Sequence, residues 1–117
     1  MLPILLILLV FSSCDIDRNI SVEKAHKFLG HSDILFLDVR TRQECVKEGR
    51  IKNALLIPVS VLERRLAELE QHREKKIIVY CRTDRRSQIA TDILISNDFN
   101  AFKMDGGFLA WKEYSRP

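Results

Sequence analysis

The stretch that most constrains the fold is residues 77–96, where a short apolar run leads through a polar loop into helical spacing. Residues 77–80 are Ile-Ile-Val-Tyr, which is typical of a strand that is buried on both faces. The run ends at Cys81, and a loop with three arginines follows. Apolar residues at 89, 90, 93 and 94 then predict a helix over residues 87–96. Cys81 is therefore expected between the end of a strand and the beginning of a helix.

This position has consequences for the chemistry of Cys81. Loop amides and a helix N-terminus converge there, and both carry partial positive charge. Arg82, Arg85 and Arg86 add three guanidinium groups. Such surroundings favour a thiolate over a thiol and attract anions. The stretch predicts a thiolate nucleophile in an anion-binding loop, and the alternative is a structural cysteine buried at a strand end.

Further apolar runs alternate with helix signals along the rest of the chain. The runs cover residues 34–37, 54–57 and 101–104. The expected helices follow Ser21, the capping box Thr41-Arg42-Gln43-Glu44, the capping box Ser60-Val61-Leu62-Glu63 and the turn at residues 105–107. Short apolar strands that alternate with capped helices predict an α/β domain with a mainly parallel sheet. Catalytic groups in such folds lie at the carboxyl ends of strands, where Cys81 is expected.

Length and composition limit the possible functions. The 117 residues allow one domain, and the net charge of +3 is modest. No stripe of lysine and arginine alternates with aromatic residues, so no nucleic-acid partner is expected. Cys14, Cys45 and Cys81 are far apart, and the three histidines lie in no ligand-like group. The sequence therefore predicts neither a disulfide framework nor a metal site, and no cofactor.

The amino terminus has the features of an export signal. Residues 2–11 are almost wholly apolar, which is too short for a membrane-spanning helix of about 20 residues but typical of a signal peptide. Phe11-Ser12-Ser13-Cys14 resembles a bacterial lipobox, which implies cleavage before Cys14 and a lipid on its sulfur. We expect a lipoprotein-type signal peptide at 1–13, a short tether at 14–19 and a domain at 20–117. The protein would be membrane-anchored in the periplasm of a bacterial envelope. A plain signal peptide with an incidental Cys14, or a short hydrophobic anchor, is the alternative.

Four motifs follow one another in a fixed order in the mature chain. They are Asp38-Val39-Arg40 with Glu44, then Gly49-Arg50-Ile51 with Ala54, Ile57 and Pro58, then residues 79–87, then Gly106-Gly107 with Trp111. Together they resemble the single-domain rhodanese sulfurtransferases over nearly all of the mature chain. The resemblance implies an α/β fold with a central, mainly parallel, five-stranded sheet flanked by helices. It also implies a cysteine that carries sulfane sulfur as a persulfide.

The loop departs from the family pattern at one important position. The pattern reads Cys-Arg-Ser-Gly-x-Arg-Ser, and Thr83 stands for the first Ser while Asp84 stands for Gly. A glycine at that place suggests a left-handed backbone, which Asp adopts more readily than most residues. The Asp84 carboxylate would also bring negative charge to an anion site.

The resemblance implies a thiosulfate sulfurtransferase in which Cys81 is the nucleophile. The thiolate would attack the outer sulfur of a small sulfur-containing anion such as thiosulfate, and the persulfide would pass sulfur to a thiol or cyanide acceptor. The residues expected to bind the anion are Arg82, Thr83, Asp84, Arg85, Arg86 and Ser87. Asp38 and Arg40 are expected to support the loop, as a structural ion pair rather than by touching the substrate.

Two other functions remain open. One is a sulfur-carrier or redox-sensing module without efficient turnover, because Asp84 alters the loop and an exposed thiol in the envelope is easily oxidised. The other, less favoured, is a cysteine-dependent phosphatase or arsenate reductase. Those enzymes place five residues between Cys and Arg, whereas four separate Cys81 from Arg86. Tyr80 also stands where such phosphatases usually have His.

Overall fold

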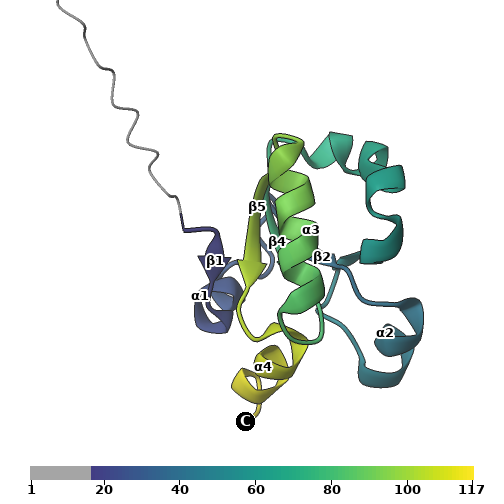
Figure 1. The fold of residues 1–117 in the computed structure, drawn as a ribbon. Helices are drawn as coiled ribbons and strands as arrows, with labels where there is room; N and C mark the ends of the chain where they lie inside the picture. Colours follow the sequence, from purple (N-terminus) through teal and green to yellow (C-terminus); the bar gives the residue numbers. More distant parts are fainter. Residues whose placement is uncertain (1–16) are drawn as a thin grey trace, which may run out of the picture.

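The structure, a computed structural model that describes residues 17–117, is built around one sheet of five parallel strands (Figure 1). The strands are β1 (Asn19–Ile20), β2 (Ile34–Asp38), β3 (Leu55–Leu56), β4 (Lys76–Tyr80) and β5 (Asn100–Met104). Their order across the sheet is β1-β5-β4-β2-β3, and every pair is parallel. The five-stranded α/β fold expected from the sequence is confirmed.

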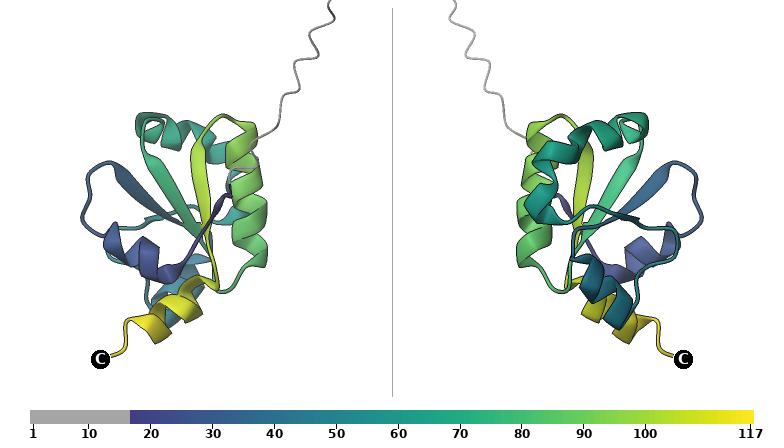
Figure 2. Two further views of the ribbon diagram at one scale, coloured as in Figure 1. Left: turned by 90° about the vertical axis from the view of Figure 1, so that its left-hand side faces the viewer. Right: turned by 90° about the vertical axis from the view of Figure 1, so that its right-hand side faces the viewer.

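Helices cover both faces of this sheet, as the two side views show (Figure 2). The α-helices are α1 (Val22–Lys27), α2 (Arg42–Glu48), α3 (Arg85–Ser96) and α4 (Gly107–Tyr114). Two 3-10 helices, η1 (Val59–Val61) and η2 (Glu63–His72), lie between β3 and β4. The side-chain oxygens of Ser21 and Thr41 accept hydrogen bonds from backbone amides of α1 and α2, so both expected N-caps are present.

Two apolar cores explain the continuous apolar runs of the central strands. Ile77 and Val79 pack on one face of β4 with Ala90 and Leu94 of α3. The alternate residues of the strand pack on the other face, together with residues of α1 and α4: Ile78, Tyr80, Ala25, Phe108 and Trp111. Each strand residue thus faces one core or the other, so the run has no polar interruption.

The segment after Pro58 differs from the expectation. The capping box at residues 60–63 is not formed, and the α-helix predicted there is replaced by the 3-10 helices η1 and η2. Pro58 begins the turn two residues earlier, so Ser60 lies inside η1 instead of before a helix. The apolar side of this segment still faces the core, because Leu62 and Leu69 are fully buried beside α3.

Three further details of the structure were not expected. Helix α3 begins at Arg85, two residues before the predicted start, and Ile89 on it is 46% exposed instead of buried. The two-residue strand β1 carries no apolar run and was missed.

Residues 1–16, with the expected signal peptide and Cys14, lie outside the described part of the chain. Within residues 17–117 no helix has both the length and the apolar character needed to cross a membrane.

Candidate active site

Cys81 lies directly after β4, at the carboxyl end of the central strand, as predicted. We call residues 81–87 the Cys81 loop. The sulfur is almost fully buried, and Ser87 contacts it twice. The Ser87 N–H donates to Sγ at 3.3 Å, and the Cys81 S–H donates to the Ser87 hydroxyl oxygen at 3.3 Å. That hydroxyl in turn donates to the Asp84 carbonyl at 3.0 Å. The first turn of α3 therefore supplies an amide and a hydroxyl to the thiol.

The first turn of α4 holds the backbone of the Cys81 loop from the other side. The Phe108 N–H donates to the Cys81 carbonyl at 2.8 Å, and the Leu109 N–H donates to the Arg82 carbonyl at 3.2 Å. Gly107 has a φ of +61°, and a Cβ added to it would lie 2.3 Å from the Thr83 carbonyl oxygen. Gly106 and Gly107 thus form a turn, as expected, and Gly107 also allows α4 to touch the loop backbone.

Asp84 does not adopt the backbone conformation that we inferred from the family glycine. Its φ is −131°, which is ordinary for any residue, so the expected left-handed conformation is wrong. Its carboxylate Oδ1 accepts hydrogen bonds from the Lys103 ammonium at 2.7 Å and the Gly106 N–H at 2.9 Å. These two hydrogen bonds, with that from Lys103 the stronger influence, lower the pKa of Asp84. The carboxylate is therefore bound by β5 and α4.

Two of the three loop arginines are paired with carboxylates of α2. Arg86 makes a two-fold contact with Glu44, at 2.5 and 2.8 Å. The hydrogen bond from Arg86 lowers the pKa of Glu44 to about 2. Arg82 Nε lies 3.3 Å from Glu48 Oε1. Arg85 is exposed and forms no ion pair with any residue of 17–117. A surface cavity of about 460 Å³ lies between α2 and Arg82.

Asp38 and Arg40 form a fully buried ion pair beside the loop. Arg40 Nη2 lies 2.7 Å from Asp38 Oδ2 and donates to the Gly49 carbonyl at 2.8 Å. The guanidinium carbon is 4.2 Å from the centre of the Phe108 ring. Burial opposes the charge on Arg40 most strongly, but the hydrogen bond to Asp38 and the electrostatic attraction of Asp38 and neighbouring groups together raise the pKa of Arg40. The pair thus connects β2, α2 and α4, in line with the expected structural role.

Cys45 is held as a thiol next to this ion pair. Its S–H donates to Asp38 Oδ2 at 3.3 Å. Burial and the charge of Asp38 raise the pKa of Cys45 to about 11. A thiol in this state is a poor nucleophile at neutral pH, so Cys45 is not an equivalent of Cys81.

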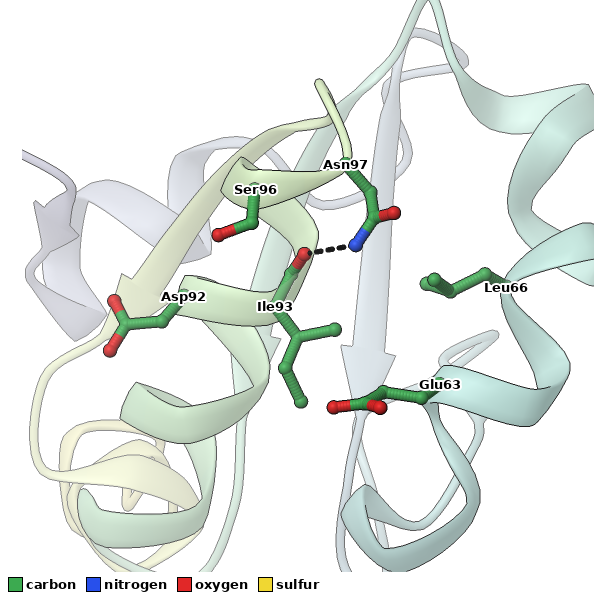
Figure 3. Close-up of a pocket in the computed structure, with 6 residues that line it drawn as sticks. All are labelled: Glu63, Leu66, Asp92, Ile93, Ser96 and Asn97. Carbon is green, nitrogen blue, oxygen red and sulfur yellow. Dashed lines mark hydrogen bonds between the residues drawn. The ribbon is translucent and has the colours of Figure 1, made fainter.

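A second surface pocket lies far along α3 from the sulfur (Figure 3). Its lining residues come from η2, from the carboxyl-terminal half of α3 and from the C-cap of α3: Glu63, Leu66, Asp92, Ile93, Ser96 and Asn97. The Asn97 side-chain amide donates to the Ile93 carbonyl at 2.8 Å. None of the predicted site residues lines this pocket.

Residues 17–117 also contain no cluster of three or more His, Cys, Asp or Glu side chains arranged to hold a metal ion.

Two site residues, Lys103 and Glu48, were missed by the sequence reasoning. The contact of Gly107 with the loop backbone was missed as well. Lys103 is only 8% exposed and stands within an otherwise apolar strand run, which is the one signal that could have drawn attention to it. Glu48 lies one helical turn after Glu44, so the spacing predicts a shared face but not the partner.

Comparisons with known proteins agree with this geometry. A model of the rhodanese-like domain family matches residues 21–114. A sulfurtransferase from Allochromatium vinosum is 30% identical over 86 residues, which cover 73% of this chain and 78% of the relative. A tRNA uridine(34) hydroxylase from Citrobacter koseri is 29% identical over 111 residues, but this chain spans only 31% of that protein's length.

A solved structure shares the architecture. The rhodanese-related protein from Thermoplasma volcanium superposes with a TM-score of 0.77 at 31% identity, covering 86% of this chain and 95% of that one. The family match covers nearly all of the described residues, and the sheet and its helices are those of a known rhodanese-related structure. This chain belongs to the rhodanese-like domain family.

Proposed function

We propose that the protein is a sulfurtransferase that moves sulfane sulfur through a persulfide on Cys81. The observation that carries the proposal is the pair of Ser87 contacts to the Cys81 sulfur at the end of β4. A thiol in this place has hydrogen-bond donors for a developing negative charge. Membership of the rhodanese-like family and a relative named sulfurtransferase support the same assignment.

The reaction divides into two displacements at sulfur. The Cys81 thiolate attacks the outer sulfur of a donor such as thiosulfate, and the sulfur–sulfur bond of the donor breaks. The electron pair of that bond leaves with sulfite, and a persulfide remains on Cys81. A thiolate or cyanide then attacks the outer sulfur of the persulfide. That second displacement regenerates the Cys81 thiolate.

Ser87 can serve both protonation states of Cys81. In the thiol state its hydroxyl accepts the S–H and donates to the Asp84 carbonyl. After the proton leaves, the hydroxyl can turn and donate to the thiolate, beside the Ser87 N–H. The Asp84 carbonyl keeps a hydrogen bond from the Gln88 N–H at 2.9 Å. The turn of the hydroxyl therefore leaves no buried carbonyl unpaired.

The charges around the loop favour recognition of a small anion. Arg85 offers a guanidinium that no carboxylate of residues 17–117 neutralises. Arg82 and Arg86 can also bind an anion, but they must exchange their contacts with Glu48 and Glu44. The sulfur donor thus competes with the carboxylates of α2 for these two arginines, which predicts modest affinity for thiosulfate.

The proposal also places the domain in a bacterial envelope, tethered through a lipid on Cys14. Its support is the apolar run at residues 2–11 and the lipobox-like segment that follows. The tRNA substrate that is named for the hydroxylase relatives is not proposed for this chain, because this chain covers only 31% of the length of that relative.

One assay tests the catalytic proposal. The full chain is incubated with thiosulfate and cyanide, thiocyanate is measured, and the mass of the Cys81 peptide is recorded. We expect thiocyanate and a gain of one sulfur atom on Cys81, both lost in Cys81→Ser and retained in Cys45→Ser. A persulfide without turnover would favour the carrier function. Turnover of a phosphate ester without any persulfide would overturn the proposal.

A further inference from the structure

A chain of contacts joins Lys103 on β5 to the sulfur of Cys81. The Lys103 ammonium lies 2.7 Å from Asp84 Oδ1, which also accepts the Gly106 N–H at 2.9 Å. The carbonyl of the same Asp84 accepts the Ser87 hydroxyl at 3.0 Å. That hydroxyl lies 3.3 Å from the Cys81 sulfur. Asp84 is therefore held through its side chain and holds Ser87 through its backbone.

The position of Lys103 is itself well fixed. Its Cα pairs with Val79 of β4 in the sheet, two residues before Cys81. Its side chain is 10% exposed, and a buried ammonium requires hydrogen-bonded carboxylates nearby. Two are present, Asp84 at 2.7 Å and Asp105 at 3.1 Å. Asp84 belongs to the Cys81 loop and Asp105 does not, so the Lys103 side chain can position the loop through its contact with Asp84.

We propose that Lys103 is a positioning residue for Cys81. By binding the Asp84 side chain, Lys103 fixes the residue from which α3 begins, because the Asp84 carbonyl accepts the Gln88 N–H at 2.9 Å. The fixed first turn of α3 keeps the Ser87 N–H at the sulfur in both the thiol and the thiolate. An ion pair to β5 thus orders the loop at the position where the family pattern has a glycine. The inference deepens the proposed function, but it concerns the reactivity of the thiol and involves no sulfur donor.

The test is the pH profile of Cys81 alkylation by iodoacetamide, a neutral reagent, in the full chain. Loss of the free Cys81 peptide is followed by mass, so Cys14 and Cys45 do not interfere. Lys103→Met and Asp84→Asn should each move the inflection of the profile upward by about 0.5 to 1 pH unit, because the Ser87 N–H is then less well placed to donate to the thiolate. The double variant should move it no further than the larger single shift, because both changes remove the same ion pair.

A purely electrostatic effect predicts a different result. Removing the positive charge of Lys103 would raise the inflection, but removing the negative charge of Asp84 would lower it. Asp105→Asn is the matched control, since it removes the second carboxylate of Lys103 without touching the loop. The positioning role predicts no shift for this variant. The nearby charges of Arg86 on α3 and Glu44 on α2 are the same in all variants.

A downward shift in Asp84→Asn, or equal shifts in Asp84→Asn and Asp105→Asn, would overturn the proposal. If Lys103→Met does not fold, the two aspartate variants decide alone, because both side chains are 53% exposed and tolerate an amide. Alkylation needs no sulfur donor. A protein that fails to make thiocyanate but has the expected profiles would therefore lose the proposed function and keep this inference.

Discussion

Gly107 is the residue that sets how closely α4 approaches the Cys81 loop. Gly107→Ala would place a Cβ 2.3 Å from the Thr83 carbonyl oxygen and 2.6 Å from that of Cys81. Backbone atoms cannot move aside as a flexible side chain can, and the φ of +61° adds strain. We expect a loss of about 2 kcal/mol or more in the free energy of unfolding, measured by urea denaturation, together with reduced sulfur transfer.

Gly30 provides the matched control for this substitution. Its φ is +79°, but a Cβ there would meet no atom within 4 Å. Gly30→Ala should therefore cost only the backbone strain, about 1 kcal/mol, and leave sulfur transfer unchanged. An equal loss in the free energy of unfolding for Gly107→Ala and Gly30→Ala would mean that the close contact between α4 and the Cys81 loop adds nothing to the cost of the substitution.

Asp84→Gly restores the residue of the family pattern, and the structure predicts that it does not improve the site. The negative charge of the carboxylate is already compensated by Lys103 and the Gly106 N–H, so its removal relieves little repulsion of the donor. The φ of −131° requires no glycine, and glycine adds freedom to the unfolded chain. We expect a loss of about 1 kcal/mol in the free energy of unfolding, and a KM for thiosulfate that does not fall. A clearly lower KM would show that Asp84 repels the donor.

At the scale of residues, the sequence predicted those site residues whose positions depend on neighbouring parts of the chain. Cys81 and Ser87 follow from a strand end and a helix start that lie six residues apart. Lys103 could not be assigned, because its carboxylate partner Asp84 is 19 residues away and meets it only after β4 and β5 pair. The pairing of Arg86 with Glu44, 42 residues apart, depends equally on the tertiary fold.

At the scale of elements, helix α2 lies beside the Cys81 loop and pairs its carboxylates Glu44 and Glu48 with the loop arginines. Arg86 lowers the pKa of Glu44 to about 2, from an ordinary value of 4.5. The folded protein therefore binds fewer protons at Glu44 than the unfolded chain does between these values. The stabilisation is complete above about pH 4.5 and is lost as the pH falls toward about 2. Glu44→Gln should reduce the acid dependence of the urea midpoint between about pH 7 and about pH 3.

The control for Glu44→Gln is Glu63→Gln. Glu63 is an exposed carboxylate that forms no ion pair within the described part of the chain. Its replacement should leave the acid dependence as it is in the unchanged protein. The same acid dependence in Glu44→Gln and the unchanged chain would contradict a stabilising role of the pair with Arg86.

The elements that the sequence predicted well are those whose signal is local and repeated. The capping box at residue 41 is formed, and Thr41 itself has the extended backbone of an N-cap. The similar pattern at residue 60 failed because Pro58 had already started a turn, which a search for capping residues alone does not weigh. Strand β1 has two residues and owes its pairing to the edge of β5, so its own sequence carries almost no signal.

For the whole molecule, the apolar runs predicted a parallel sheet but not its strand order. A run that is buried on both faces could lie anywhere in the interior of such a sheet. The order β1-β5-β4-β2-β3 brings the ends of β2 and β4 together, and this places the Asp38–Arg40 pair next to Cys81. Only the family resemblance, whose motifs include the ends of both strands, anticipated that the Asp38–Arg40 pair would lie next to Cys81.

The expected lipid anchor would act on the molecule through its first strand. Residues 15–19 can reach at most about 18 Å, so a lipid on Cys14 would keep Asn19 close to the bilayer surface. Asn19 pairs with Lys103 at the edge of the sheet, two strands from Cys81. A tethered protein would thus present its active site near the membrane.

Cys14→Ser tests this arrangement in a bacterial host. The unchanged chain should be found in the membrane fraction with the mass of a lipid on Cys14, and Cys14→Ser should lose both. Sulfur transfer by the detergent-solubilised proteins should be equal, because Cys14 precedes the domain that carries Cys81. An unmodified Cys14 in the membrane fraction would exclude the lipid anchor and favour the short hydrophobic anchor instead.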